Sequence, residues 1–406
     1  MIELFVEKKN CCGCGTCMNV CPKHAIHMEK DEAGFVYPKI TKEQCIECGI
    51  CKKICAFQRE SSLNKPLRVL AIAGKNEDLV KKSASGGLFA TLALTVLKQR
   101  GCVYGAVMQR ENRKLHIHHV CCETKEDLER LQGSKYVQSS LEEVFKDVQN
   151  KLRQDRNVLF SGTPCQVDAL KAYLKKSYEK LIVVDIICHG VPSEQFFNDY
   201  IHYLEKKIDG EISDFKFRDK SSGWGLNAKV CYINKNGENF EYTMSYLDSS
   251  YYDLFLNAKI YRENCYHCHY ATKKRVGDIT IGDYWGIENE HPDALQQNGG
   301  TLSKQNGISV MLLNTDKGIT FFENVKNQFI YYESTFEKVA KRNTQLVHPV
   351  ECTKERNQIL TLYRKWGYRT VEIYFWCDVQ KSKAKKLARQ IFLKKARQII
   401  KKILYR

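Results

Sequence analysis

From residue 67 onward, short apolar runs of strand length alternate with longer stretches in which apolar residues recur at helical spacing. The short runs predict strands over residues 68–74, 101–109, 115–121, 156–161, 180–187, 212–218, 227–234, 240–244, 276–282 and 308–313. The longer stretches predict helices over 86–99, 124–131, 141–153, 165–176, 193–208, 249–258 and 317–327. Strands that alternate with helices in this way indicate an α/β or α+β domain with a mixed sheet.

The first 60 residues follow a different pattern, with two short alternating segments at Ile26–Met28 and Phe35–Tyr37 that predict a hairpin. A polar linker over 58–66 follows. We therefore expect a small domain at 1–60, a main domain at 66–345 with parts 66–155 and 156–345, and a helical basic tail at 346–406.

Two cysteine runs in the first segment share the spacing C-x2-C-x2-C-x3-C. They comprise Cys11, Cys14, Cys17 and Cys21, then Cys45, Cys48, Cys51 and Cys55. In bacterial ferredoxins with this spacing, the fourth cysteine of each run binds the other [4Fe–4S] cluster. We expect Cys11, Cys14, Cys17 and Cys55 on one cluster, and Cys45, Cys48, Cys51 and Cys21 on the other. A pair of zinc knuckles would be built from CxxC pairs, which these triplets do not match. Cys12 is out of register and is not predicted to be a ligand.

Four further cysteines form a possible third site. Cys165 and Cys188 each follow a predicted strand, and the carboxyl ends of consecutive parallel strands meet at one sheet edge. Binding sites of such sheets lie at that edge. Cys265 and Cys268 add a CxxC pair. The spacing alone leaves open a third [4Fe–4S] cluster, a zinc site, or cysteines that are simply packed in the core.

The main domain resembles the beta-subunit family of coenzyme F420-reducing hydrogenases and dehydrogenases, in the bacterial form with a fused ferredoxin domain. The matching blocks are Ser83–Phe89, Gly133–Ser139, Ser161–Gln166, Cys188–Ser193, Phe217–Lys220 with Gly223–Trp224, Cys265 to Cys268, Arg275, Asp278–Ile279 and Gly282–Gly286. The resemblance implies a domain that binds FAD and a [4Fe–4S] cluster, with Cys165, Cys188, Cys265 and Cys268 as the ligands of that cluster.

A flavin site has weaker support from the residues themselves. Serines and glycines that open the predicted 86–99 helix could cradle a pyrophosphate, or simply cap the helix. The 133–139 loop could hold a phosphate or the flavin edge, or be a solvated turn. The expected cofactor contacts are Ser85, Gly86, Gly87, Ser134, Lys135, Tyr136, Gln138, Thr163 and Gln166. His189 is the candidate catalytic proton donor, and the alternative is a structural hydrogen bond to the backbone. The sequence has no Rossmann or P-loop glycine motif.

Charge and cysteine content refine this interpretation. The chain has 19 cysteines and no secretory pattern, so we expect metal ligation in a reducing cytoplasm. Residues 378–406 hold eleven lysines and arginines against one acidic residue, which is +10 of the net +17. The basic character therefore belongs to the tail and does not indicate nucleic-acid binding. Residues 380–406 have an amphipathic pattern that resembles a helix in peripheral contact with a membrane, and the alternatives are a docked helix or a disordered basic end.

These features predict an iron–sulfur flavoprotein oxidoreductase. Electrons would pass from the ferredoxin-type clusters through the third cluster to FAD and an organic substrate, with a sugar-linked compound suggested by analogy only. The expected partner is ferredoxin or another one-electron donor or acceptor. The alternatives are a non-catalytic electron-transfer subunit and a zinc-stabilised scaffold.

Overall fold

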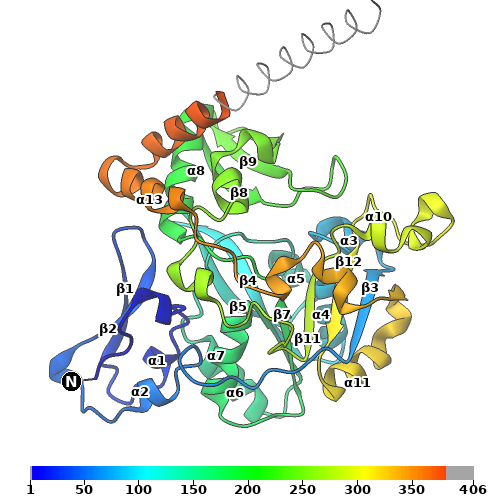
Figure 1. The fold of residues 1–406 in the computed structure, drawn as a ribbon, viewed down its shortest axis with the longest axis horizontal. Coiled ribbons are helices and arrows are strands. Elements are labelled where there is room, and N and C mark those ends of the chain that lie inside the picture. Colours follow the sequence, from blue (N-terminus) through cyan, green and yellow to red (C-terminus); the bar gives the residue numbers. More distant parts are fainter. Residues whose placement is uncertain (1, 381–406) are drawn as a thin grey trace, which may run out of the picture.

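The computed structural model describes residues 2–380, in which an N-terminal segment packs against a larger α/β body (Figure 1). The amphipathic basic helix expected at 380–406 falls almost entirely outside the described residues. Within residues 2–380, no helix has both the length and the apolar character needed to cross a membrane.

The body is built on a mixed eight-stranded sheet with the order β13-β3-β12-β11-β7-β6-β4-β5. Its strands are β3 (Arg68–Gly74), β4 (Cys102–Glu111), β5 (Lys114–Cys122), β6 (Val158–Gly162), β7 (Leu181–Ile186), β11 (Ile279–Asp283), β12 (Ser309–Leu313) and β13 (Phe329–Glu333). The central strands β11, β7, β6 and β4 are parallel, and the outer pairs are antiparallel. The mixed α/β architecture is as predicted.

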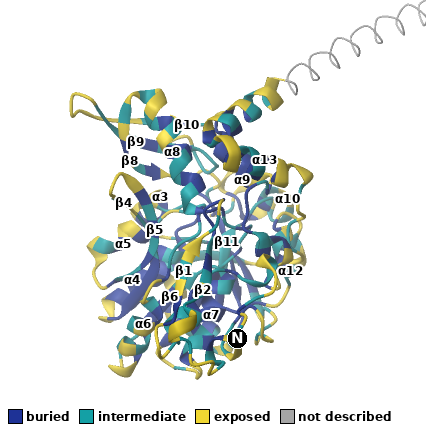
Figure 2. Cartoon of the chain, turned by 90° about the vertical axis from the view of Figure 1, so that its left-hand side faces the viewer, coloured by how far each residue is buried: buried dark blue, intermediate teal, exposed yellow. Residues whose placement is uncertain are grey.

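Helices pack on the faces and edges of this sheet. They are α3 (Glu77–Lys82), α4 (Leu88–Lys98), α5 (Lys125–Leu131), α6 (Val144–Arg153), α7 (Pro164–Leu174), α8 (Glu194–Ile208), α9 (Ser250–Leu256), α10 (Ile287–Glu290), α11 (Asp316–Val325), α12 (Phe336–Ala340) and α13 (Lys354–Trp366). Buried apolar residues of α4 fill one core against β3, β4 and β6. Figure 2 shows the buried residues, in dark blue, concentrated at the centre of the body beneath exposed loops.

A second, three-stranded antiparallel sheet lies beside α8. It contains β8 (Gly210–Lys216), β9 (Ala228–Asn234) and β10 (Asn239–Met244) in the order β10-β9-β8. Its inner face shares an aromatic-rich core with α8, α9 and α13, in which Phe197, Phe215 and Phe217 are fully or nearly fully buried. This aromatic core supports the segment that carries Arg262 and the CxxC pair.

The N-terminal segment has short helices α1 (Thr16–Asn19) and α2 (Ile50–Lys53) and the hairpin β1 (Ile26–Lys30) with β2 (Val36–Ile40). The hairpin forms where the alternation predicted it. Cys12, Ala56 and Phe57 are buried in the same core as Phe160 and Tyr270 of the body. The segment is therefore packed on the body through shared apolar residues.

The 58–66 linker is polar as expected but is tied to the body. The Arg59 guanidinium pairs with Asp168 of α7 at 2.8 Å, and the Ser61 hydroxyl also donates to that carboxylate. Asn64 forms a two-way backbone bridge with Arg275. These bonds hold the linker against α7 and the strand that leads into β11.

The structure corrects the start of one helix. The predicted helix 86–99 begins at Leu88, with Gly87 as N-cap in the left-handed conformation at a φ of 76°. Ser83 and Ser85 do not cap it, because the Ser83 hydroxyl donates to Leu79 O at 2.7 Å and the Ser85 hydroxyl to Ile308 O at 3.0 Å. A carbonyl of α3 accepts from the Ser83 hydroxyl and a distant carbonyl accepts from the Ser85 hydroxyl, so neither serves the cap that local sequence assigned to it.

Candidate redox site

Four cysteines meet at the carboxyl edge of the large sheet. Parallel pairing of β6 with β7 places Cys165, at the start of α7, beside Cys188, which follows β7. Cys265 and Cys268 come from a short 3-10 helix, Glu263–His267, and the residue after it. All four line one cavity of about 380 Å³. The geometry thus brings together the four residues expected for the third site.

The electrostatics of these four thiols suit metal ligands. Burial raises the pKa of Cys188 well above its usual range, and neighbouring thiols of the same group raise it further. Burial likewise raises the pKa of Cys265 to about 12 and that of Cys268 to about 11. Burial makes Cys188, Cys265 and Cys268 resist ionisation alone, and all four closely packed thiols become thiolates when a positively charged metal centre binds them. The donor set fits an iron–sulfur cluster.

The ferredoxin-type cysteines also gather in two groups. Burial raises the pKa of Cys17 well above its usual value, and Cys14, Cys11 and Cys55 add to this effect in that order. Cys55, the last cysteine of the second run, therefore lies with the first run. In the same way Cys21 lines a small pocket with Cys45, Cys48 and Cys51. The crossing of the fourth cysteines matches the arrangement that the spacing predicts.

The two groups differ in exposure. Cys48 is exposed, and Ile46 beside it leaves 58% of its surface in solvent. The group with Cys11 lies between the hairpin and the body, where burial raises the pKa of Cys11 to about 11. We call the Cys45–Cys48–Cys51–Cys21 group the outer site and the Cys11–Cys14–Cys17–Cys55 group the inner site.

Cys12 lies between the inner site and the four-cysteine site of the body. Its buried thiol is within hydrogen-bonding reach of both Cys14 and Cys165. This contact with Cys12 lowers the pKa of Cys14 to about 6 and also lowers the pKa of Cys165. A residue that the sequence left without a role therefore connects two ligand groups.

The serine–glycine segment before α4 forms part of the cavity wall. Ser85 and Gly87 line the cavity, whereas the Gly86 N–H donates to the Ser309 hydroxyl at 2.9 Å. The amide that was expected to bind a phosphate is thus already bonded within the protein. Ser85 and Gly87 remain as contacts for a cofactor.

The 133–139 loop lines the same cavity with Ser134, Lys135, Tyr136 and Gln138. The Lys135 ammonium donates to Gln132 O at 2.8 Å and Arg130 O at 3.1 Å. It pairs with no carboxylate among residues 2–380, and burial lowers its pKa to about 7. A buried amine of this kind is a binding group for an anion.

Gln166 joins this loop to α7. Its side-chain oxygen accepts from the Thr163 N–H at 3.0 Å, and its amide donates to the Ser139 hydroxyl at 2.9 Å. The Thr163 hydroxyl lies 3.1 Å from the Cys165 sulfur. Thr163 and Gln166 therefore hold the wall of the cavity in place, with little hydrogen-bonding capacity left for a ligand.

Two histidines present neutral imidazoles in the cavity lining. His189 makes no hydrogen bond to the described part of the chain, and burial lowers its pKa. The sequence did not single out His119. Its Nε2–H donates to Ser161 O at 3.0 Å, because a carbonyl oxygen can only accept a hydrogen bond. Its buried Nδ1 has no hydrogen-bond partner within residues 2–380. Burial lowers the pKa of His119 to about 4, so this nitrogen is an acceptor.

A polar cluster at the end of β11 was also missed. The Arg218 guanidinium pairs with Asp283 at 2.8 Å and also donates to Tyr136, Ala84 O and Gly225 O. The indole N–H of Trp224 donates to Asp283, and its ring stacks on Trp285 with centroids 4.6 Å apart. These residues belong to the blocks Phe217–Lys220 and Gly282–Gly286, whose spacing gave no indication of mutual contact. Arg218 is fully bonded within the protein and stabilises the cavity rim.

The comparisons with known proteins agree on the organisation of the chain. A family model described as the coenzyme F420 hydrogenase/dehydrogenase beta subunit N-term matches residues 69–146, and the corresponding C terminus model matches 155–338. A 4Fe-4S dicluster domain model matches residues 10–58. Together the two beta-subunit models cover more than half of the chain.

Individual relatives are more distant. An uncharacterized ferredoxin from Methanocaldococcus jannaschii is 44% identical over 36 residues, which are 9% of this chain and 47% of that protein. The chain therefore spans about half the length of the curated relative that it matches. A chain of the F420-reducing [NiFe] hydrogenase complex from Methanosarcina barkeri is 14% identical with a TM-score of 0.41, over 74% of this chain and 94% of that one.

Proposed function

Because this chain belongs to the coenzyme F420 hydrogenase/dehydrogenase beta-subunit family and carries a ferredoxin-type 4Fe-4S domain, we propose that it is an iron–sulfur flavoprotein oxidoreductase. In this proposal the outer and inner sites each hold a [4Fe–4S] cluster, and the four body cysteines hold a third. FAD occupies the cavity beside them, and an organic substrate, for which a sugar-linked compound is one class to test, reaches the flavin from the open side.

One observation carries the proposal: the four body cysteines and the free polar groups of the loop and strands line a single cavity. Its volume of about 380 Å³ lies within the range of cofactor and small-molecule pockets. Bound there, a flavin would supply two-electron chemistry next to a one-electron centre. A four-thiol zinc site would explain the cysteines but not the unpaired groups beside them.

The residues present fit an anionic, hydrogen-bonding cofactor. Lys135 offers an ammonium group that lacks a carboxylate partner, and it suits a phosphate or an electron-rich ring edge. His119 lines the same cavity with an imidazole that burial keeps neutral. His189, neutral and unbonded within residues 2–380, is positioned to exchange a proton with whatever binds in the cavity.

The outer site is the proposed entry point for electrons. Its exposed Cys48 and Ile46 leave the cluster-binding loop open to a one-electron carrier such as ferredoxin. From there the inner site and then the four-cysteine site lie in sequence toward the cavity, joined by Cys12. The ligand groups therefore form a path from the protein surface to the proposed flavin.

The deciding experiment is anaerobic purification with iron, sulfide and flavin measured together on the same sample. The proposal expects about twelve irons, about twelve sulfides and one FAD per chain. About eight irons without flavin would leave the ferredoxin domain intact and reject the flavoprotein. Stoichiometric zinc with the eight irons would support the zinc-stabilised scaffold instead.

A second candidate is a non-catalytic electron-transfer subunit of a larger redox complex. It is favoured by the complete internal bonding of Arg218, Thr163 and Gln166, which leaves few polar groups at the cavity for a substrate. Steady-state assays separate the two functions. The purified holoprotein with reduced ferredoxin turns over a small-molecule acceptor alone only if it is an enzyme.

A further inference from the structure

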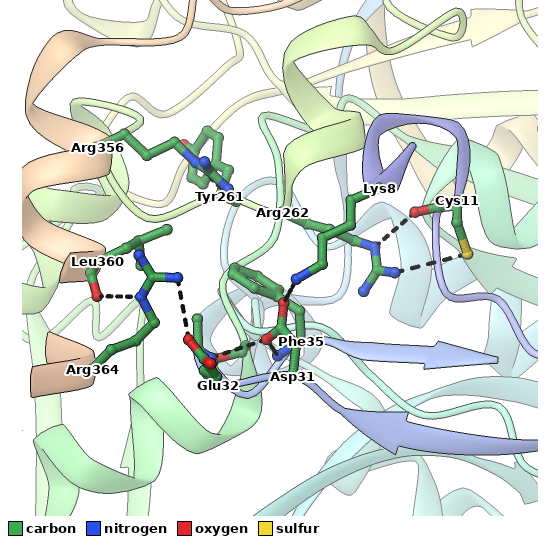
Figure 3. Close-up of polar contacts among 12 residues, drawn as sticks. Lys8, Cys11, Asp31, Glu32, Phe35, Tyr261, Arg262, Arg356, Leu360 and Arg364 are labelled. Carbon is green, nitrogen blue, oxygen red and sulfur yellow. Dashed lines mark hydrogen bonds and ion pairs between the residues drawn. The ribbon is translucent and has the colours of Figure 1, made fainter. Parts of the chain in front are cut away.

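Arg262 connects the inner site to the segment that carries the CxxC pair. Its side chain is fully buried, and Nε donates to the Cys11 carbonyl at 3.0 Å, with Nη2 3.9 Å from the Cys11 sulfur (Figure 3). Nη1 donates to the Gln138 side chain at 3.3 Å. The guanidinium carbon lies 4.0 Å from the centre of the Tyr37 ring. Arg262 stands three residues before Cys265, so one side chain reaches from the body into the ferredoxin domain.

The backbone of the first cysteine run is shaped around this guanidinium. Gly13 has a φ of 68°, and a Cβ at this position would lie 2.9 Å from the guanidinium carbon of Arg262. A side chain at residue 13 would therefore displace the cation from the ligand loop. The loop and the arginine fit closely, which fixes the charge beside the thiols of the inner site.

The charge of Arg262 has no carboxylate to balance it. Arg218 and Arg275, which are also buried, pair with Asp283 at 2.8 Å and with Asp185 at 3.1 Å. No acidic oxygen of the described residues lies within ion-pair distance of Arg262, and the acids of the neighbouring hairpin have other partners: Asp31 pairs with Lys8 at 2.6 Å, Glu29 with Lys39 at 2.9 Å and Glu32 with Arg364 at 3.4 Å. A buried cation without a counter-charge is strongly unfavourable. The groups next to this cation are cysteines, which become negative as cluster ligands.

We propose that Arg262 is the built-in counter-charge of the inner cluster and sets its reduction potential above the value that burial alone would give. A [4Fe–4S] cluster with four thiolates carries a net negative charge, and one added electron makes it more negative by one. A fixed cation a few ångströms away in a low-dielectric setting stabilises the reduced form more than the oxidised form. Burial has the opposite effect, because it penalises the more highly charged state.

The charge of Arg262 affects the direction in which electrons pass between the outer and inner clusters. The outer site reaches solvent through Cys48, although Cys51 is buried, whereas the inner site is packed between the hairpin and the body beside Arg262. Without Arg262 the covered cluster would be the harder one to reduce, and electrons from the surface would stop at the outer cluster. With Arg262 the inner cluster can accept an electron from the outer one and pass it on. This inference rests on a loaded ferredoxin domain and not on the flavin part of the proposed function.

The test is an EPR-monitored redox titration of the reconstituted full-length protein, comparing wild type with Arg262→Gln and Arg262→Lys. Arg262→Gln should shift one ferredoxin-domain midpoint potential to a more negative value and leave the other unchanged. Arg262→Lys keeps the charge and should stay near wild type. Arg356→Gln is the matched control. It removes another buried arginine. Nε and Nη2 of Arg356 donate to the carbonyl of Tyr261, the residue before Arg262, at 3.1 and 3.0 Å.

Iron content decides the remaining outcomes. Loss of about four irons in Arg262→Gln but not in Arg262→Lys supports the proposal, because the charge alone then rescues the cluster. The proposal is overturned by unchanged potentials in a fully loaded Arg262→Gln protein, by an equal shift in Arg356→Gln, or by cluster loss in both Arg262 variants. Flavin content enters none of these readouts, so the flavoprotein proposal can fail while this one stands.

Discussion

Lys135 links the protonation state of one residue to cofactor binding. Since burial lowers its pKa to about 7, the amine is charged below that pH and neutral above it. An anionic cofactor should therefore bind about tenfold more weakly at pH 8.5 than at pH 6. His119, with a pKa lowered to about 4 by burial, stays neutral across this range. Quenching of FAD fluorescence by the flavin-free protein measures the affinity at each pH.

Lys135→Met supplies the comparison for this pH dependence. The variant should bind FAD more weakly at pH 6 and show a flat profile from pH 6 to pH 8.5. A pH dependence that survives in Lys135→Met would assign the titration to another group and remove Lys135 from the cofactor site.

Substitution of Cys12 tests whether this cysteine is a metal ligand or only a buried side chain between two ligand groups. Its thiol touches Cys14 and Cys165 but lies outside both cysteine runs. Cys12→Ala should keep the full iron content and lower the free energy of unfolding by about 1 kcal/mol, the cost of a small buried side chain. Cys11→Ala, one residue away, should lose about four irons. Iron analysis and chemical denaturation of the two variants distinguish a packed thiol from a ligand, and iron loss in Cys12→Ala would make it one.

At the residue scale, the sequence predicted what depends on spacing and missed what depends on long-range contact. The cysteine groups could be proposed because ferredoxin spacing is regular along the chain. Arg262 could not, because its partners Cys11 and Tyr37 lie more than 200 residues away. His119 was missed for a similar reason: a histidine in the run His116-Ile117-His118-His119 gives no sign that one of its nitrogens will lack a partner in the fold.

The start of α7 is the element that holds the two walls of the cavity together. Gln166 bonds to Thr163 on its own helix and to Ser139 on the loop. Gln166→Leu leaves these buried groups unpaired and should cost about 1–3 kcal/mol of stability. The variant should also retain less iron and flavin, because Cys165 and the loop lose their shared anchor. Thermal unfolding and cofactor content are the measurements.

Asn198→Leu is the matched control for this element. Asn198 of α8 likewise ties two segments, through bonds to Leu115 N at 2.7 Å and Leu115 O at 2.9 Å on β5, but it does not line the cavity. It should lose comparable stability and keep its cofactors. Equal cofactor loss in both variants would mean that Gln166 acts only through global stability.

Elements with strong periodicity were predictable, and those set by tertiary contacts were not. The predicted strands at 68–74 and 227–234 agree with β3 and β9 to within one residue. Strand β13 was missed, whereas α13 falls in the helical tail predicted over 346–406, for which no helix bounds were predicted. β13 is only five residues long and is recognisable chiefly by its pairing with β3, and α13 has a buried side that depends on the aromatic core. Helix α4 starts later than predicted, and the Ser83 and Ser85 hydroxyls bond to Leu79 O of α3 and to the distant Ile308 O instead of capping it.

At the scale of the whole molecule, the ferredoxin segment and the body behave as one folded unit. Cys12, Ala56 and Phe57 share a core with the body, and Asp168 binds both the linker and Tyr270 of the body. The sequence predicted two domains joined by a polar linker, and composition alone could not reveal that the linker is bonded along its length. A rigid attachment keeps the cluster sites at fixed separations, which electron transfer requires.

Asp168→Ala tests this attachment. The Asp168 side chain is 2% exposed and accepts from Arg59 at 2.8 Å and from the Tyr270 hydroxyl at 2.8 Å. Its removal leaves the Tyr270 hydroxyl with only the 3.4 Å bond to Ala56 O and breaks the linker's bonds to α7, which should cost about 3 kcal/mol. Because the linker then detaches before the body unfolds, trypsin should cleave at Arg59 early in a limited digest, and mass spectrometry of the fragments identifies the site.

The control is Glu129→Ala, which breaks an exposed pair with Lys82 and should leave the digest unchanged. If Arg59 is cut equally fast in wild type and Asp168→Ala, the linker is not held by this carboxylate, and the fixed spacing of the inner and body sites must come from the shared apolar core, the Asn64–Arg275 bridge and Arg262.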